Sequence, residues 1–110
     1  MTQSTSKYHN HKTLYQGIQF DSRKEASRYQ ELLLMQRAGL IRNIELQPRY
    51  DLIVNAHKLG FYKGDFRYEE IDTGEIVVED VKGGNATKTP VYVLKRKLVK
   101  ALYNVDIIEV

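Results

Sequence analysis

Glu75-Ile76-Val77-Val78-Glu79-Asp80-Val81-Lys82 is the stretch that decides the fold. Side chains alternate between the two sides of a strand, and in this segment apolar residues fall on both sides. That pattern is typical of a central strand covered on both faces. The turn signal Asp72-Thr73-Gly74 precedes the segment and Gly83-Gly84-Asn85 ends it. We therefore predict a central strand over residues 75–82.

Outward from this strand, the chain alternates between extended and helical patterns. The capping box Ser22-x-x-Glu25 begins a helical repeat that Gly39 ends. Pro48 interrupts an extended run, so the strand there lies at an edge or bends. In chain order we predict a hairpin over 13–15 and 18–20, a helix over 22–38, extended runs over 44–54 and 59–70, the strand over 75–82, a helix over 90–103 and a last strand over 105–110. This β-β-α-β-β-β-α-β order indicates a mixed α/β domain.

The second helix has its own signals. Pro90 suits an early helical position, where its missing N–H is not needed. Four apolar residues then recur at helical spacing and form a stripe that we expect to face the core: Val91, Leu94, Leu98 and Leu102.

Composition restricts the class of protein. The 110 residues, 42% hydrophobic and 28% charged, are enough for one small folded domain, which we place at 12–110 after a flexible polar tail at 1–11. The chain has no cysteine, which excludes disulfides and thiolate zinc sites. Because no apolar run approaches a membrane span and the polar N-terminus does not resemble a signal peptide, we expect a cytoplasmic protein.

The distribution of charge is more informative than the net value of +3. Carboxylates crowd into residues 65–80, whereas residues 83–105 contain no acid and five basic side chains. One interpretation is a solvated hairpin followed by a solvated helix face. The other is a metal-assisted phosphodiester enzyme, in which carboxylates hold the cation and basic residues hold the phosphate backbone.

Spacing points to one constellation. Asp80 and Lys82 share a face of the predicted strand, and the turn near residue 73 brings Asp65 to about residue 81 on the neighbouring strand. Two carboxylates can hold Mg²⁺, and a lysine can position the attacking water and stabilise developing charge. A surface ion pair between Asp80 and Lys82 is the alternative.

Several segments together resemble a family of small phage and prophage nucleases. Asp65 followed by Asp80-Val81-Lys82 looks like the PD-(D/E)XK signature, with Gly64 where proline is usual. The similarity covers residues 7–110 and includes Phe20-Asp21-Ser22-Arg23-Lys24-Glu25-Ala26, Leu46-Gln47-Pro48, Gly64-Asp65-Phe66-Arg67-Tyr68, Val78-Glu79-Asp80-Val81-Lys82-Gly83 and Thr87-Lys88-Thr89-Pro90-Val91-Tyr92. The family is akin to Holliday-junction resolvases. The resemblance implies a restriction-endonuclease-like αβββαβ core, in which helices flank a mixed β-sheet. The N-terminal hairpin is additional to that core.

The resemblance also implies that the first helix supplies an acid, and Glu25 matches that position. Its place in the capping box explains a glutamate there equally well. Glu79 competes with Asp80 as metal ligand, but alternation favours Asp80 and places Glu79 on the opposite face with Val77 and Val81. In similar nucleases the carbonyl at the position of Val81 also reaches the metal.

Further residues are candidates for contact with DNA. Thr87, Lys88 and Thr89 precede the second helix, whose N-terminal amides suit a phosphate. Lys95 and Arg96 lie off the predicted apolar stripe, where contact with DNA and simple solvation are both open. Gln47 either lies near the active site or is a strand residue that faces water.

The residues and the resemblance together predict a Mg²⁺-dependent endodeoxyribonuclease, in which Mn²⁺ can replace Mg²⁺. Asp65, Asp80 and Glu25 are the expected metal ligands, and Lys82 is the expected catalytic lysine. Its expected substrate is branched DNA, as for a phage Holliday-junction resolvase in the host cytoplasm. Symmetric cutting of a four-way junction requires two active sites, so a homodimer is expected. The alternatives are a sequence- or mismatch-directed nicking endonuclease and a catalytically idle DNA-binding or assembly subunit with the nuclease fold.

Overall fold

The strand that decides the fold, β7 (Ile76–Asp80), lies inside a mixed four-stranded sheet. This computed structural model describes residues 12–82 and 88–110, so the predicted tail at 1–11 lies outside the described residues. The sheet has the order β3-β6-β7-β8, in which β3 (Ile41–Leu46) pairs antiparallel with β6 (Phe66–Glu70), β6 pairs antiparallel with β7, and β7 pairs parallel with β8 (Ile107–Glu109). The expected α/β class with a mixed sheet is confirmed.

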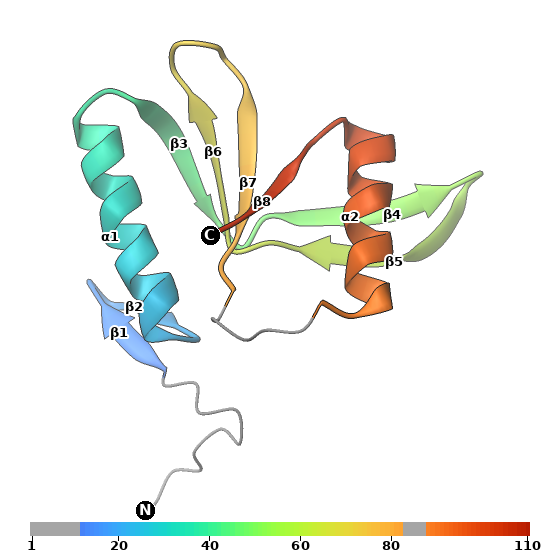
Figure 1. The fold of residues 1–110 in the computed structure, drawn as a ribbon, viewed down its shortest axis with the longest axis horizontal. Coiled ribbons are helices and arrows are strands. Elements are labelled where there is room, and N and C mark those ends of the chain that lie inside the picture. The colour runs from blue at the N-terminus through green and yellow to red at the C-terminus, as the bar shows by residue number, and fades with distance from the viewer. Residues whose placement is uncertain (1–11, 83–87) are drawn as a thin grey trace, which may run out of the picture.

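Two helices cover opposite sides of this sheet (Figure 1). The first, α1 (Arg23–Arg37), packs through Ala26 and Leu32 against a core that includes Phe66 of β6. The second, α2 (Pro90–Tyr103), packs through Val99 against a separate core that contains Val78 of β7. Val78 and Glu79 are both completely buried, which confirms that β7 is covered on its two faces.

Both helices begin with a capping side chain, and the cap of α1 is the one that the sequence predicts. Ser22 is the N-cap of α1, where its hydroxyl accepts from the backbone N–H of Glu25 at 3.1 Å. Thr89 is the N-cap of α2 and accepts from Tyr92 N–H at 3.1 Å, with Pro90 in the first turn. The predicted helix limits, 22–38 and 90–103, agree with the structure to within one residue.

Both long extended runs break into two strands, which corrects the prediction of continuous strands over 44–54 and 59–70. The first divides into β3 and β4 (Arg49–Val54), and the second into β5 (His57–Lys63) and β6. The breaks lie opposite each other: Gln47 N–H donates to the carbonyl of Asp65 at 3.0 Å, and Gly64 N–H donates to the carbonyl of Pro48 at 2.9 Å. The bend expected at Pro48 is present, and it sends β4 and β5 out of the sheet.

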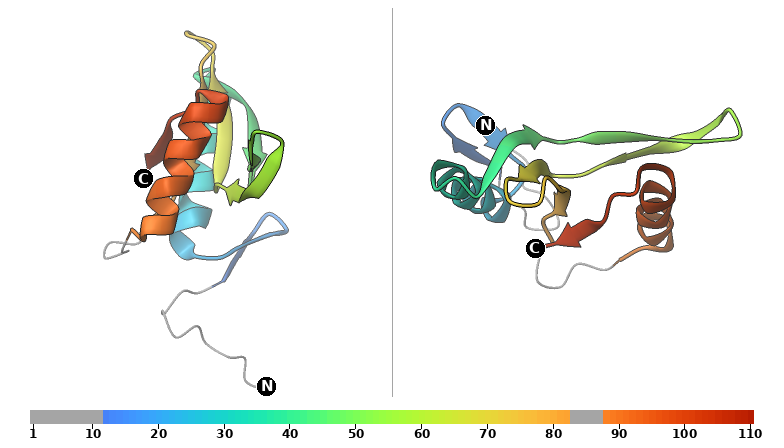
Figure 2. Two further views of the ribbon diagram at one scale, coloured as in Figure 1. Left: turned by 90° about the vertical axis from the view of Figure 1, so that its right-hand side faces the viewer. Right: turned by 90° about the horizontal axis from the view of Figure 1, so that it is seen from above.

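The two strands beyond the break form an arm of their own. β4 and β5 pair antiparallel with each other and project past α2 (Figure 2). The arm contributes Leu52 and Tyr62 to the core under α2. A shorter hairpin, β1 (Thr13–Tyr15) with β2 (Ile18–Phe20), packs on α1 as the sequence predicts.

Of the apolar stripe predicted for α2, Leu98 packs against the core and the other three residues are largely exposed. Val91, Leu94 and Leu102 are 61%, 57% and 40% exposed, and Leu98 is half-buried. The helix is turned instead so that Val99 is buried and Tyr92 and Arg96 reach the C-terminal strand. The polar contacts of Tyr92 and Arg96 with β8 fix this rotation, and the periodicity of apolar residues does not reveal them. No helix in the described residues is both long and apolar enough to cross a membrane.

A substitution at Gly64 tests how much the paired break, formed by Gln47-Pro48 opposite Gly64-Asp65, contributes to stability. A Cβ at this position would lie 2.9 Å from Cγ1 of the fully buried Val78. We expect Gly64→Ala to lower the free energy of unfolding by about 1–3 kcal/mol, as overpacking of a core does. Chemical denaturation of the single variant and of the same change in a Val78→Ala background measures this effect. The cost of Gly64→Ala should fall towards zero once Val78 is truncated, and an equal cost in both backgrounds would contradict the clash.

Candidate functional site

Four predicted site residues meet at one end of the sheet. Asp65 lies in the break between β5 and β6, Asp80 ends β7, and Lys82 follows two residues later. Glu25, in the first turn of α1, interacts electrostatically with both Asp65 and Asp80. The N-termini of α1 and α2 point to this same end of the molecule (Figure 1).

Backbone hydrogen bonds fix Asp65 beside the end of β7. The Asp65 N–H donates to the carbonyl of Glu79 at 2.9 Å, and the Val81 N–H donates to Oδ2 of Asp65 at 2.6 Å. Phe66 faces Glu79 in the ladder, so Asp65 comes beside Asp80 after a one-residue adjustment of the predicted register. The predicted proximity of the two aspartates is confirmed.

Asp80 and Lys82 are held by aromatic side chains from both sides of the site. The Tyr62 hydroxyl donates to Oδ2 of Asp80 at 2.7 Å, and the Lys82 ammonium lies 3.6 Å from the same oxygen. The Lys82 ammonium also lies 3.8 Å from the centre of the Tyr92 ring, a cation–π contact. The side chains of Asp80 and Lys82 are 13% and 29% exposed, so both groups are oriented while still in reach of a ligand.

The clustering of carboxylates is electrostatically unfavourable without a cation. Burial, together with the charges of Glu25 and Asp80, raises the pKa of Asp65 to about 7, against the lowering effect of the Val81 N–H. Burial and the nearby Asp21 and Asp80 charges likewise raise the pKa of Glu25. Within the described residues, Lys82 forms an ion pair with Asp80, and neither Asp65 nor Glu25 forms one with a basic side chain.

Glu79 is excluded from this cluster, as the alternation of side chains predicts. It is completely buried on the α1 face of β7, where Arg28 binds it in a two-pronged ion pair, from Nε at 2.8 Å and Nη2 at 2.6 Å. The Tyr68 hydroxyl donates a third hydrogen bond at 2.5 Å. These donors satisfy the Glu79 carboxylate, which therefore has a structural environment rather than one open to a ligand.

Two hollows lie on either side of the aspartates. The smaller one, of about 170 Å³, contains Glu25, Asp65 and Gln47 in its lining. Gln47 thus lies beside Glu25 and Asp65, in the break between β3 and β4, and is itself exposed. The larger one, of about 430 Å³, contains Asp80 and Lys82 in its lining and lies between β5 and the N-terminus of α2.

The predicted DNA-contact residues separate into two groups. Thr89 and Lys95 line the larger hollow beside Asp80. Lys88 pairs with Glu109 at 2.8 Å, while Arg96 donates to the carbonyl of Ile107 at 3.0 Å and also approaches Glu109. Thr87 lies outside the described residues.

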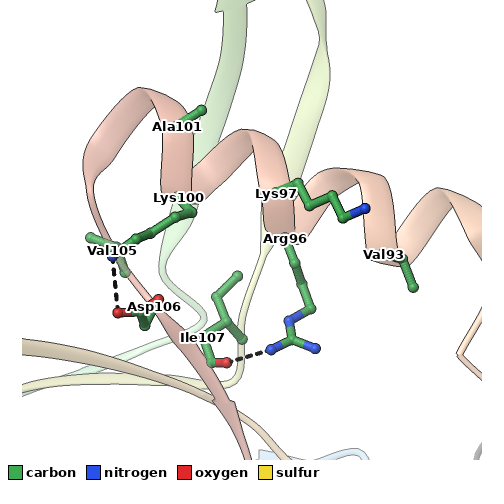
Figure 3. Close-up of a pocket in the computed structure, with 8 residues that line it drawn as sticks. All are labelled: Val93, Arg96, Lys97, Lys100, Ala101, Val105, Asp106 and Ile107. Atoms are coloured by element: carbon green, nitrogen blue, oxygen red, sulfur yellow. Dashed lines mark hydrogen bonds and ion pairs between the residues drawn. The ribbon is translucent and has the colours of Figure 1, made fainter.

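Another hollow of about 430 Å³ lies away from the aspartates, between α2 and β8 (Figure 3). Figure 3 shows Arg96 reaching the Ile107 carbonyl and Lys100 reaching Asp106, a pair 3.0 Å apart. Both cations join the helix to the C-terminal strand. We therefore interpret this hollow as part of the packing between α2 and the C-terminal segment, and not as part of the site.

Sequence reasoning missed three residues that contact the cluster. The Tyr62 hydroxyl hydrogen-bonds Asp80, the Tyr92 ring makes a cation–π contact with Lys82, and the Lys24 ammonium donates to the carbonyl of Lys82. Tyr92 has core-like spacing in the helix, and Lys24 lies far from Lys82 in the chain, so neither has a local signal. Tyr62 is the exception, because it shares a strand face with Gly64, directly before Asp65.

The donor set suits Mg²⁺. Within residues 12–82 and 88–110, no group of three or more histidine, cysteine, aspartate or glutamate side chains is arranged to hold a metal ion. Mg²⁺ usually binds through one or two carboxylates and keeps several waters, so a full protein cage is not required. Asp65 and Asp80 supply hard oxygen donors, and the mutual repulsion of the carboxylates favours a cation.

Comparison with known proteins gives one match. The model of a family described as "Protein of unknown function (DUF1064)" matches residues 5–108. The chain belongs to this family. Neither the curated proteins nor the solved structures yield a match for it.

Removal of the Asp65 charge should stabilise the metal-free protein at neutral pH. Because the folded pKa, about 7, exceeds the ordinary value of 3.8, the carboxylate opposes folding fully above pH 7 and hardly at all below pH 4. We expect Asp65→Asn to raise the free energy of unfolding at pH 8 by on the order of 2 kcal/mol.

Denaturant titrations in EDTA at pH 8 and pH 4 measure this gain. The stability of the natural protein should rise as the pH falls through this window, while that of Asp65→Asn should rise less. Asp72→Asn, at an exposed carboxylate in the turn between β6 and β7, is the matched control. A gain from Asp65→Asn that is the same at both pH values would contradict the assignment.

Proposed function

We propose that this protein is a Mg²⁺-dependent endodeoxyribonuclease with a restriction-endonuclease-like core. The observation that carries the proposal is the placement of Asp65, Asp80 and Lys82 together at the end of a covered central strand, with Glu25 beside them. The two aspartates are also held in place, Asp65 by the Val81 N–H and Asp80 by the Tyr62 hydroxyl, which is not expected of unrelated surface charges. The arrangement suits hydrolysis of a phosphodiester.

The topology supports the proposed core. Without the β1–β2 hairpin and the β4–β5 arm, the remaining elements follow the order α1-β3-β6-β7-α2-β8. That is the αβββαβ succession implied by the resemblance to PD-(D/E)XK nucleases, and both hairpins become additions to it. The arm leaves the sheet at the residue before Asp65 and thus borders the site.

The residues have distinct proposed roles. Asp65, Asp80 and the Val81 carbonyl would hold Mg²⁺ or Mn²⁺, with Glu25 close enough to bind through water. When bound, such an ion polarises the scissile phosphate and lowers the pKa of a coordinated water. Lys82, fixed by Asp80 and Tyr92, orients a water for attack and stabilises charge on the phosphate. Tyr62 keeps the Asp80 carboxylate in position.

The surroundings favour a nucleic acid as substrate. The amide end of α2, capped by Thr89, lies beside the site and suits a phosphate, and Lys95 lies close by. Lys88 and Arg96 add positive charge next to Glu109. A homodimer acting on branched DNA remains our proposal for the assembly, because two sites are needed to cut a four-way junction symmetrically.

Substitutions in the cluster test the reaction. We expect Asp80→Asn and Lys82→Ala each to slow Mg²⁺-dependent cleavage by about 100-fold or more, since acid–base and electrostatic groups typically contribute that much. Circular dichroism and DNA binding should stay near normal. Asp72→Asn is again the matched control. Full activity in the two site variants, or cleavage in excess EDTA, would contradict the metal-dependent site.

A panel of DNA substrates tests the substrate class. Labelled linear, nicked, flap and four-way-junction DNAs are incubated with Mg²⁺ or Mn²⁺, and the cut positions are mapped. Symmetric nicks across the junction are the expected result for a resolvase. Cuts at one sequence or at a mismatch would indicate the nicking alternative, and no cleavage of any DNA would indicate the idle binding subunit.

A further inference from the structure

The larger hollow beside Asp80 has the features of a binding subsite. It has a volume of about 430 Å³, within the range of small-ligand pockets, and lies between the arm strand β5 and the first turn of α2. Asp80 and Lys82 form one side of it. The other sides include Phe61, Lys63 and Lys95. Whatever occupies it lies next to the proposed scissile phosphate.

An aromatic ring with a cation against it borders the hollow. Phe61 is 39% exposed, and the Arg49 guanidinium lies 3.9 Å from its ring centre. The Lys95 ammonium lies 5.6 Å from the same ring. Aromatic rings and guanidinium planes are the two surfaces on which proteins stack unpaired bases. Arg49 also restrains the ring, so the platform is ordered before a ligand arrives.

Free positive charge surrounds the same space. Within the described residues, neither Lys63 nor Lys95 forms an ion pair with a carboxylate, and Asp80 is the one acid in the lining. The smaller hollow on the other side of the aspartates contains Glu25 and Asp65 and no cation. A polyanionic strand is therefore drawn to the larger hollow and repelled from the smaller one.

We propose that the hollow bounded by Phe61, Lys63 and Lys95 holds an unstacked nucleotide of a single-stranded DNA segment that flanks the scissile phosphate. In a duplex the faces of each base are covered by its neighbours, whereas an unpaired nucleotide can place its base on Phe61 and its phosphate near the lysines. This inference rests on the proposed nuclease function and narrows it. The substrate class is DNA that carries an unpaired stretch beside the cut.

Binding without catalysis tests the subsite. Fluorescence anisotropy in EDTA compares labelled oligothymidylate with a blunt duplex. Phe61→Leu should weaken binding of oligothymidylate about tenfold, the effect expected from loss of one stacked base, and leave duplex binding nearly unchanged. Phe61→Tyr should retain affinity. Leu59→Ala, at a 62% exposed position on the same strand, is the matched control and should change neither.

The lysines give a second readout. Lys63→Ala and Lys95→Ala should each reduce the slope of log affinity against log salt by about 0.7 for the single strand. Equal effects of Phe61→Leu on both DNAs, or no effect on either, would overturn the subsite even if the enzyme cleaves DNA. A selective loss in a protein that cleaves nothing would leave the subsite standing and refute the nuclease instead.

Discussion

The site depends on one feature of the backbone, the paired break at which two strands leave the sheet together. Two hydrogen bonds hold it, from Gln47 to Asp65 and from Gly64 to Pro48. Gln47 has a left-handed backbone with φ of 51°, and Pro48 has no N–H with which to continue the strand ladder. At residue 64, Val78 packs so close to the backbone that there is no room for a side chain. Together these constraints stop the ladder directly before Asp65. They place that carboxylate at the end of β7 and direct the arm over α2.

Glu79 and Asp80 show how environment divides two neighbouring acids. Glu79 faces α1 and receives hydrogen bonds from Arg28 and Tyr68, so its charge is compensated in the core. Asp80 faces the other way, beside Asp65, with the single ammonium of Lys82 near it. The pleat of the strand alone produces this division. The strand that buries Glu79 in the core therefore presents Asp80 on its other face, beside Asp65.

The sequence predicts local structure and side-chain phase well, since both depend on near neighbours. The helix cap at Ser22, the early helical position of Pro90, the phase of Asp80 with Lys82, and the approach of Asp65 all follow from spacing and turn chemistry. The split of the two long runs does not, because the break at Pro48 is completed by Gly64 on another strand. The rotation of α2 was predicted wrongly because Tyr92 and Arg96 bind β8 by contacts that periodicity does not encode. Tyr62 and Lys24 join the site only through tertiary contact.

The net charge of +3 conceals an asymmetry that the fold creates. Lys63, Lys82 and Lys95 come from the arm, the end of β7 and α2, and they meet around one hollow. Glu25 and Asp65 meet around the other. A field that changes sign across Asp80 orients a polyanion as well as attracting it, because the lysines stabilise negative charge on one side and the carboxylates stabilise positive charge on the other. In so small a domain, this gradient gives the binding of a polyanion a direction.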